Sequence, residues 1–329
     1  MKYFARKVGF FLATLWAVVT LNFLIPRIQP GDPAELMVRR LSGKDNALDP
    51  AQVQAMRAML GTPDGSLWEQ YTAYLADLTR GDFGLSYTYY PFPVSEVIGQ
   101  AIWWTVVLVV VTQVLAFVIG IVLGTYAAWR RNGRLDSVIT LGSTFLGTLQ
   151  PFWIALLLLY VFGYTLGWLP TSGGYSAATP GFNGPFIQEA LTHSVLPALS
   201  LLIVAPVGWV LGMRNTMIMN LGEDYIRLAR AKGLPDRRVA LRYAARNALL
   251  PSVTGFALAL GSVLAGAILV ETVFDYPGLG RLMGEAVGAK DYPLLQTLML
   301  LTTVGVLVAN LVADLLYGVL DPRARRSES

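Results

Sequence analysis

The chain has 329 residues, of which 54% are hydrophobic and only 14% charged, and its net charge is +4. A soluble chain of this length would suggest about two domains, but long apolar runs recur and indicate that lipid surrounds most of this chain. The basic residues cluster beside apolar runs, which argues against nucleic-acid binding. Because there is no cysteine, a disulfide framework, a thiolate metal site and a cysteine nucleophile are excluded.

The N-terminal segment begins with Lys2, Arg6 and Lys7, followed by an apolar run over residues 8–25. A signal peptide has the same charge pattern, but this run is long for its apolar region and no small-residue cleavage site follows. Since about 20 residues cross the hydrocarbon core of a bilayer, residues 1–26 are predicted to form a retained first transmembrane helix.

Residues 27–98 are polar and rich in turn signals such as Pro30-Gly31-Asp32-Pro33. A short helix is predicted over residues 51–60. Ser66 and Glu69 have the spacing of a capping box, which predicts the start of a second helix. We therefore expect a small helical lobe outside the lipid between the first and second transmembrane helices.

Five further apolar runs follow, at residues 102–129, 138–168, 195–218, 253–273 and 294–320. Prolines interrupt the fourth run, at Pro197 and Pro206, and such prolines are tolerated where neighbouring helices satisfy the freed carbonyls. The predicted fold is an all-α membrane protein with six transmembrane helices, in which residues 99–329 form a five-helix core.

The orientation follows from the lysines and arginines. The six apolar runs separate polar segments that must lie alternately on one side of the membrane and the other. The chain has 25 lysines and arginines; the segments on the side of both termini carry 17 of them, and the segments on the other side carry 8. Short cytoplasmic loops are the ones enriched in lysine and arginine. Both termini are therefore expected in the cytoplasm, with the lobe at 27–98 outside the cell.

A basic, helix-prone loop lies between the fourth and fifth runs, over residues 221–251. Within it, residues 223–251 read EDYIRLARAKGLPDRRVALRYAARNALLP. A helix over 224–232 would stop at Gly233, because glycine adopts a positive φ without steric cost. Pro235 and Asp236 suit the first turn of a second helix, which is predicted to run to about Leu250. This arrangement would present a compact knob to another protein.

Part of this loop, Ala229-Arg230-Ala231-Lys232-Gly233 followed by Leu250-Pro251, resembles the EAA loop of permease subunits of ABC importers. Arg227 and Leu228 stand where the generic motif has Glu and Ala, and the interval from Gly233 to Pro251 is longer. Both departures are usual in the peptide and nickel class of these permeases. Further matches in the same order are Pro30-Gly31-Asp32-Pro33, Gly81-Asp82-Phe83-Gly84, Pro277-Gly278-Leu279-Gly280-Arg281 and the tail Asp321-Pro322-Arg323.

In that family the loop forms a coupling helix that sits in a groove of the ATPase subunit. The resemblance therefore implies ATPase-coupling roles for Glu223, Tyr225, Arg227, Ala229, Arg230, Ala231, Lys232, Gly233 and Leu234. It also implies a bacterial or archaeal inner-membrane location, a second homologous permease subunit, one or two ATPase subunits and an extracytoplasmic solute-binding protein. The alternative is an ordinary basic cytoplasmic loop.

Motifs of enzyme sites are missing: the sequence has no His-Glu-x-x-His, no Gly-x-Ser-x-Gly and no phosphate-binding loop. We expect that the chain is not an enzyme by itself and binds no cofactor or metal, ATP and magnesium being bound by partner ATPase subunits. His193 is the only histidine, and a structural role is favoured for it over a ligand or proton-relay role.

Several polar residues fall within the apolar runs: Asn22, Gln113, Gln150, Glu271, Asn310 and Asp314. Polar groups in lipid are costly, so these residues either line a hydrophilic path or bond between helices. The interhelical role is favoured for Asn22, Gln113 and Asn310, and Asp314 is expected to pair with a basic group.

The favoured function is a permease subunit that forms half of a translocation pathway for peptides delivered by a binding protein. The same type of importer for nickel or oligosaccharides is the alternative, since no residue identifies the substrate. A self-contained secondary transporter is disfavoured by the large basic loop and the absence of an evident inverted repeat. A membrane-bound scaffold would leave the motifs unexplained.

Overall fold

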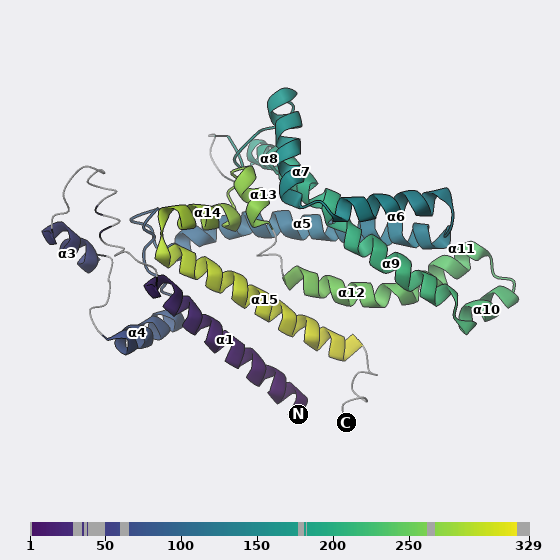
Figure 1. Ribbon diagram of the computed structural model, residues 1–329, viewed down its shortest axis with the longest axis horizontal. Helices are drawn as coiled ribbons and strands as arrows, with labels where there is room; N and C mark the ends of the chain where they lie inside the picture. The colour runs from purple at the N-terminus through teal and green to yellow at the C-terminus, as the bar shows by residue number, and fades with distance from the viewer. Residues whose placement is uncertain are drawn as a thin grey trace. The chain divides into compact units, whose positions relative to one another are not determined.

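A computed structural model describes residues 2–28, 35, 38, 50–59, 66–176, 181, 183–261 and 267–320. The described residues are mainly helical, and their only β-pairing is an isolated bridge between Leu85 and Pro93 (Figure 1). The chain forms two compact units, one of Met1–Trp104 with Pro277–Leu307 and one of Thr105–Tyr276 with Val308–Ser329.

The first unit contains α1 (Lys2–Ile28), α3 (Pro50–Met59), α4 (Leu67–Arg80), α14 (Leu279–Ala289) and the starts of α5 (Val94–Trp129) and α15 (Tyr292–Leu320). The predicted capping box is confirmed at α4, where the Glu69 amide donates to Ser66 Oγ and the Ser66 amide donates to the Glu69 carboxylate. The helix ends at Gly81, whose φ of 73° is left-handed.

Helix α1 is held within this unit by α4 and α15. The Phe23 ring packs edge-on against Tyr71, with centroids 5.1 Å apart. Asn22 Nδ2 donates to the Gln296 carbonyl at 2.7 Å, and Gln296 Nε2 donates to the Asn22 carbonyl at 3.0 Å. This reciprocal pair confirms the interhelical role predicted for Asn22.

The turn between α14 and α15 anchors the loop that precedes α5. The buried Asp291 carboxylate accepts hydrogen bonds from Ser86 Oγ at 2.6 Å and from the Thr88 amide at 2.8 Å. Its other oxygen accepts from the Leu294 amide and caps α15. The segment after the Gly81–Gly84 motif is therefore fixed to residues more than 200 positions away in the sequence.

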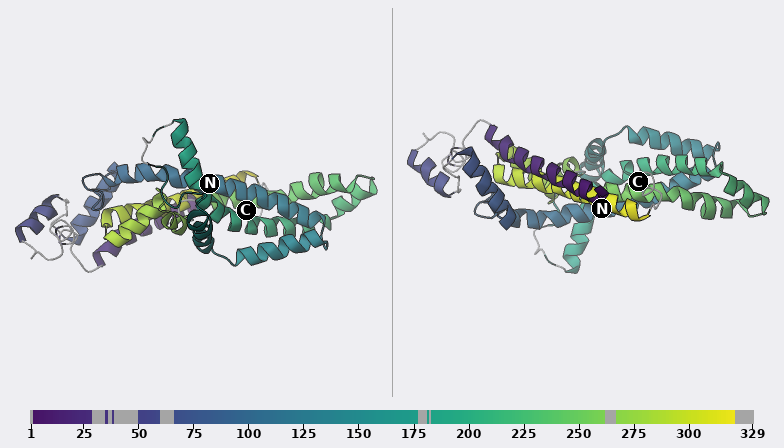
Figure 2. Two further views of the ribbon diagram at one scale, coloured as in Figure 1. Left: turned by 90° about the horizontal axis from the view of Figure 1, so that it is seen from above. Right: turned by 90° about the horizontal axis from the view of Figure 1, so that it is seen from below.

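The second unit is a helical assembly that begins with the remainder of α5. It continues through α6 (Arg134–Gly147), α7 (Pro151–Leu158), η1 (Leu159–Thr165), α8 (Gly184–Val204), α9 (Pro206–Leu221), α10 (Asp224–Ala231), α11 (Asp236–Arg238), η2 (Val239–Ala245), α12 (Arg246–Gly261) and α13 (Ile268–Val273). Within this unit α9 packs against α6 and α12, and α10 and α11 form its tip (Figures 1 and 2).

Helices α5 and α9 approach closely at two glycines. A Cβ at Gly120 would lie 2.3 Å from Trp209 Cβ, and one at Gly124 would lie 2.5 Å from the Val210 carbonyl oxygen. Small residues four positions apart allow such backbone contact between membrane helices. Any side chain at these positions would force the two helices apart.

The predicted third span is not one straight helix. Helices α6 and α7–η1 meet at a bend of 92°. Gln150, at the N-cap of α7, is extended with φ −87° and ψ 143°, because a residue before proline is disfavoured in the α conformation. The Pro151 that follows therefore breaks the span expected over residues 138–168.

Two helices in the described part of the chain are long and apolar enough to cross a bilayer: α5 and the continuous α8–α9 segment Gly184–Leu221. The bent pair is a third candidate, and Gly9–Leu24 and Tyr292–Val308 are shorter apolar helices. The predicted fifth span includes residues 262–266, which lie outside the described residues. Six spans and their orientation therefore stay predictions.

Candidate functional site

The basic loop folds as the predicted helix, glycine turn and second helix. Helix α10 ends with Gly233 at a φ of 75°. The Gly233 amide donates to the Arg230 carbonyl at 2.9 Å, and the Leu234 amide donates to the Ala229 carbonyl at 3.3 Å. These two bonds define a Schellman motif, which satisfies the last carbonyls of the helix. A Cβ at Gly233 would meet no atom within 4 Å.

One face of α10 anchors the helix to the rest of the second unit. Ile226 and Ala229 are buried in a cluster with Met217 of α9 and with Val239 and Ala240 of η2. Burying a side chain such as Ile226 contributes about 1.5–3 kcal/mol. Because isolated helices of this length are unstable in water, this packing keeps the eight-residue helix ordered.

The opposite face of α10 combines apolar and basic side chains. Leu228 is 58% exposed, and Arg227, Ala231 and Lys232 are also exposed. Arg227 pairs with Asp224 at 3.2 Å, but both side chains are largely in solvent, so the pair contributes at most about 1 kcal/mol. This face is available for a protein partner.

The nine residues with predicted coupling roles therefore divide by their environment. Exposed members are Glu223, Tyr225, Arg227, Arg230, Ala231, Lys232 and Gly233. Leu234 is half-buried, and Ala229 is buried. Leu228 is the most exposed large apolar side chain of α10, but it was not among the residues predicted to couple to the ATPase. In the comparison with the generic motif it stands only as a departure, because the motif has Ala there.

The second helix differs from its predicted extent. It does not end near Leu250 but continues through α11, η2 and α12 to Gly261, with Pro251 inside α12. Proline removes one helical hydrogen bond, and neighbouring helices make this tolerable in membrane proteins. The basic loop is thus connected to the apolar α12 by a continuous helical segment.

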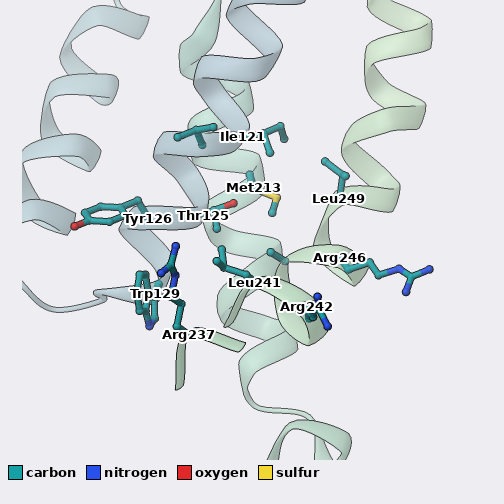
Figure 3. A pocket seen from close by; sticks show the side chains of 12 residues that line it. Ile121, Thr125, Tyr126, Trp129, Met213, Arg237, Leu241, Arg242, Arg246 and Leu249 are labelled. Atoms are coloured by element: carbon teal, nitrogen blue, oxygen red, sulfur yellow. The ribbon is translucent and has the colours of Figure 1, made fainter. Parts of the chain in front are cut away.

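An arginine-lined cleft lies beside this helical segment, between α5, α9 and η2–α12 (Figure 3). Its volume is about 760 Å³. Tyr126 and Trp129 of α5 lie on one side, and Arg237, Arg242 and Arg246 come from the other. Sequence reasoning missed this cleft, because its α5 residues lie more than 100 positions before those of α11, η2 and α12.

A partly buried ion pair connects α6 to α9 in the same unit. Arg214 donates through Nε to Asp136 Oδ1 at 2.6 Å and through Nη2 to Asp136 Oδ2 at 2.9 Å. Asp136 also accepts hydrogen bonds from the Asn132 amide and from Thr140 Oγ1. Arg214 is one of the 17 basic residues in the segments expected in the cytoplasm, and that count does not indicate which carboxylate it meets.

The remaining polar candidates occupy varied environments. Gln113 lines a cavity of about 140 Å³ between α5, α7 and α8, and Asn310 is exposed. Glu271 is fully buried in α13. The structure describes α15 at Asp314 but not its side chain, so the ion pair expected there stays a prediction.

His193 ties α8 to the preceding loop, since its Nδ1 lies 3.0 Å from the Ser172 carbonyl oxygen. This contact gives the histidine a structural role. Nearby, the buried Tyr276 hydroxyl lies 3.0 Å from Ser194 Oγ, and burial raises the pKa of Tyr276 to about 12. Over the described residues, no group of three His, Asp or Glu side chains is placed to hold a metal ion.

Residues 120–326 match the family of binding-protein-dependent transport system inner membrane components, and the chain belongs to this family. It is 36% identical to the oligopeptide transport system permease protein AppB of Bacillus subtilis, over 98% of both chains. It is 34% identical to the dipeptide transport system permease protein DppB of Escherichia coli K12, over the full length of both.

These findings confirm the resemblance predicted from the motifs. The chain is an ABC transporter permease of the peptide class and a multi-pass component of the inner membrane. Glutathione transport system permease protein GsiC of Escherichia coli O1:K1 / APEC is also 34% identical over 99% of both chains.

Proposed function

We propose that this chain forms half of the translocation pathway of an ATP-driven peptide importer and couples it to a separate ATPase through the loop at 223–251. A second homologous permease, one or two ATPase subunits and an extracytoplasmic binding protein would complete the complex. Family membership and the printed names of the full-length relatives support this proposal.

The α10 hairpin, which consists of α10, the turn at Gly233 and α11 (residues 224–238), is the observation that carries the coupling role. Its inner face is fixed by Ile226 and Ala229, while Leu228, Ala231 and Lys232 remain in solvent. A displacement of the exposed face by a bound partner would move η2 and α9 as well, because buried contacts join them to α10. In this proposal Ala229 positions the coupling helix, and the exposed residues contact the ATPase.

The proposed topology has six transmembrane helices with both termini in the cytoplasm. It puts the α10 hairpin on the side where ATP is available and the lobe at 27–98 on the side where a binding protein docks. The excess of lysine and arginine in one alternating set of segments supports this orientation.

Peptides are the proposed substrate because relatives are named for oligopeptides, dipeptides and di- or tripeptides. Import of nickel or oligosaccharides by the same type of complex is the alternative. A secondary transporter would need no exposed basic hairpin held in a fixed conformation.

To test this proposal, the chain is reconstituted in liposomes with the second permease, the ATPases and the binding protein, and ATP hydrolysis is measured with each candidate substrate. Di- and oligopeptides should stimulate ATP hydrolysis, whereas nickel and oligosaccharides should not. Liposomes with this chain alone provide the control and should show no uptake under an ion gradient. Gradient-driven uptake by the single chain would instead establish a secondary transporter.

A further inference from the structure

The arginine-lined cleft has a composition that the coupling role does not explain. Its wall on α5 includes Ile121 and Val122, and its wall on the opposite side includes Leu241 and Leu249. Arginines and these aliphatic side chains face the same space. Such a cleft fits a ligand that is anionic at one end and apolar along the rest.

The charge of this region is not balanced locally. Residues 223–251 contain seven basic and three acidic residues. Asp224 and Asp236 pair with Arg227 and Arg230. Among the described residues, no carboxylate lies within ion-pair distance of Arg237, Arg242 or Arg246.

The three arginines lie on consecutive helical segments: Arg237 on α11, Arg242 on η2 and Arg246 at the start of α12. Arg242 and Arg246 are four apart, as on one face of an α-helix. All three side chains line the cleft, although Arg246 points away from the other two in Figure 3.

The cleft also continues into an apolar surface. Val122 and Val118 on α5 are exposed, and α5 is one of the helices long and apolar enough to cross a bilayer. Tyr126 and Trp129 lie near the end of that helix, where aromatic side chains typically meet the lipid headgroups. The arginines therefore stand at headgroup level and the valines at acyl-chain level.

We propose that this cleft binds one anionic phospholipid, with its phosphate at Arg237 and Arg242, the Arg246 side chain turning toward it on binding, and an acyl chain along α5. Basic clefts at the cytoplasmic ends of transmembrane helices are suited to such headgroups. The apolar surface next to the arginines favours a lipid over a soluble phosphate. The proposal goes beyond peptide import, and it rests on the membrane location of the chain together with the orientation proposed above, which puts the cleft on the cytoplasmic side.

The test measures lipid binding to the full chain, purified in detergent and freed of native lipid, by native mass spectrometry. Phosphatidylglycerol is titrated against phosphatidylcholine with the same acyl chains, and inorganic phosphate is added as a competitor. The variant is Arg242→Gln with Arg246→Gln. The charge-matched control is Arg131→Gln with Arg134→Gln. Arg131 lies on the turn between α5 and α6 and Arg134 is the first residue of α6; both are exposed and neither lines the cleft.

Wild-type chain and the control should bind phosphatidylglycerol more tightly than phosphatidylcholine. Removal of two positive charges should weaken phosphatidylglycerol binding by on the order of 30-fold, with an unchanged thermal midpoint. The proposal would be overturned if the wild-type chain bound the two lipids with equal affinity, or if the control lost as much phosphatidylglycerol affinity as the cleft variant. Displacement of the lipid by an equimolar amount of inorganic phosphate would also overturn it. So would a cleft variant that binds lipid normally but no longer associates with the ATPase.

Discussion

Asp136 on α6 and Arg214 on α9 form a two-point ion pair 78 residues apart in the sequence, with an Nε–Oδ1 distance of 2.6 Å. The Asp136 side chain is 5% exposed and that of Arg214 21% exposed. All the hydrogen bonds to this carboxylate come from the turn before α6, from α6 itself and from α9. The pair therefore fixes the position of α6 against the helix that leads to α10.

Asp136→Asn should destabilise the protein, because it leaves the Arg214 charge without its counterion. Breaking a fully buried pair from one side costs about 3–5 kcal/mol. Because the Arg214 side chain is 21% exposed, we expect about 2 kcal/mol, which corresponds to a fall on the order of 4–8 °C in the thermal midpoint. Thermal unfolding in detergent measures this change.

Asp224→Asn is the matched control, since it removes an exposed carboxylate that pairs with Arg227. Its midpoint should move by less than about 2 °C. Replacing both members of the partly buried pair, as in Asp136→Leu with Arg214→Met, should recover part of the lost stability. Equal midpoints for Asp136→Asn and Asp224→Asn would contradict the account.

Local signals predicted much of the fold because the interactions behind them are local. Ser66 and Glu69 are three residues apart and form the predicted capping box. The ion pair of Asp136 and Arg214 has no such signal, because no pattern in the sequence specifies which distant charge a carboxylate will meet. Pro151 did carry a signal for the break in the third span, namely the restriction that proline puts on the preceding residue.

The carboxylate of Asp291 is predicted to hold the loop before α5. Asp291→Ala removes hydrogen bonds to Ser86, Thr88 and Leu294 and should cost at least about 2 kcal/mol, since buried donors lose their acceptor. Limited proteolysis should show faster cleavage within residues 84–92. Asp82→Ala is the control, because Asp82 bonds only an exposed loop amide; equal cleavage rates in the two variants would argue against the anchor.

The proposed orientation is open to labelling, because the chain has no cysteine. Ser176 and Ala231 are both exposed. Ser176→Cys should react with a membrane-impermeant maleimide added to intact cells. Ala231→Cys, in cells that produce the chain without its ATPase, should react only after the membrane is permeabilised. The reverse pattern would invert the topology argued from lysine and arginine.

Leu228 is predicted to be the main apolar contact with the ATPase. Leu228→Ala should weaken ATPase association by about tenfold, which is the loss expected from removing roughly 1.4 kcal/mol of apolar burial. The fold should be unaffected, since the side chain is already exposed. Co-purification of the ATPase measures the effect, and Leu67→Ala, equally exposed on α4, should have none.

The proposed coupling site was predictable only in part. The glycine stop at Gly233 follows from residue type, and the φ of 75° confirms it. Which side of α10 is buried depends on η2 and α9, so the sequence did not separate Ala229, which is buried, from Leu228, which is exposed. The π-helix η2 also carried no signal, because its residues are ordinary helix formers.

The central claim is that the α10 hairpin transmits the conformational change driven by ATP hydrolysis from the ATPase to the membrane helices. The variant Gly233→Val tests this claim most directly. A Cβ at Gly233 meets no atom, so valine adds only the strain of a left-handed backbone, about 1–2 kcal/mol. Gly233→Asn should retain function, because asparagine tolerates this conformation. Gly81→Val is the matched control, since Gly81 caps α4 with φ 73° and the same two hydrogen bonds, also in open space.

The measurement is substrate-stimulated ATP hydrolysis by the reconstituted complex. The account predicts that Gly233→Val inserts and assembles in the membrane but loses stimulation, while Gly233→Asn and Gly81→Val keep it. Wild-type stimulation in Gly233→Val, or an equal loss in Gly81→Val, would contradict the assignment of the α10 hairpin as the coupling element.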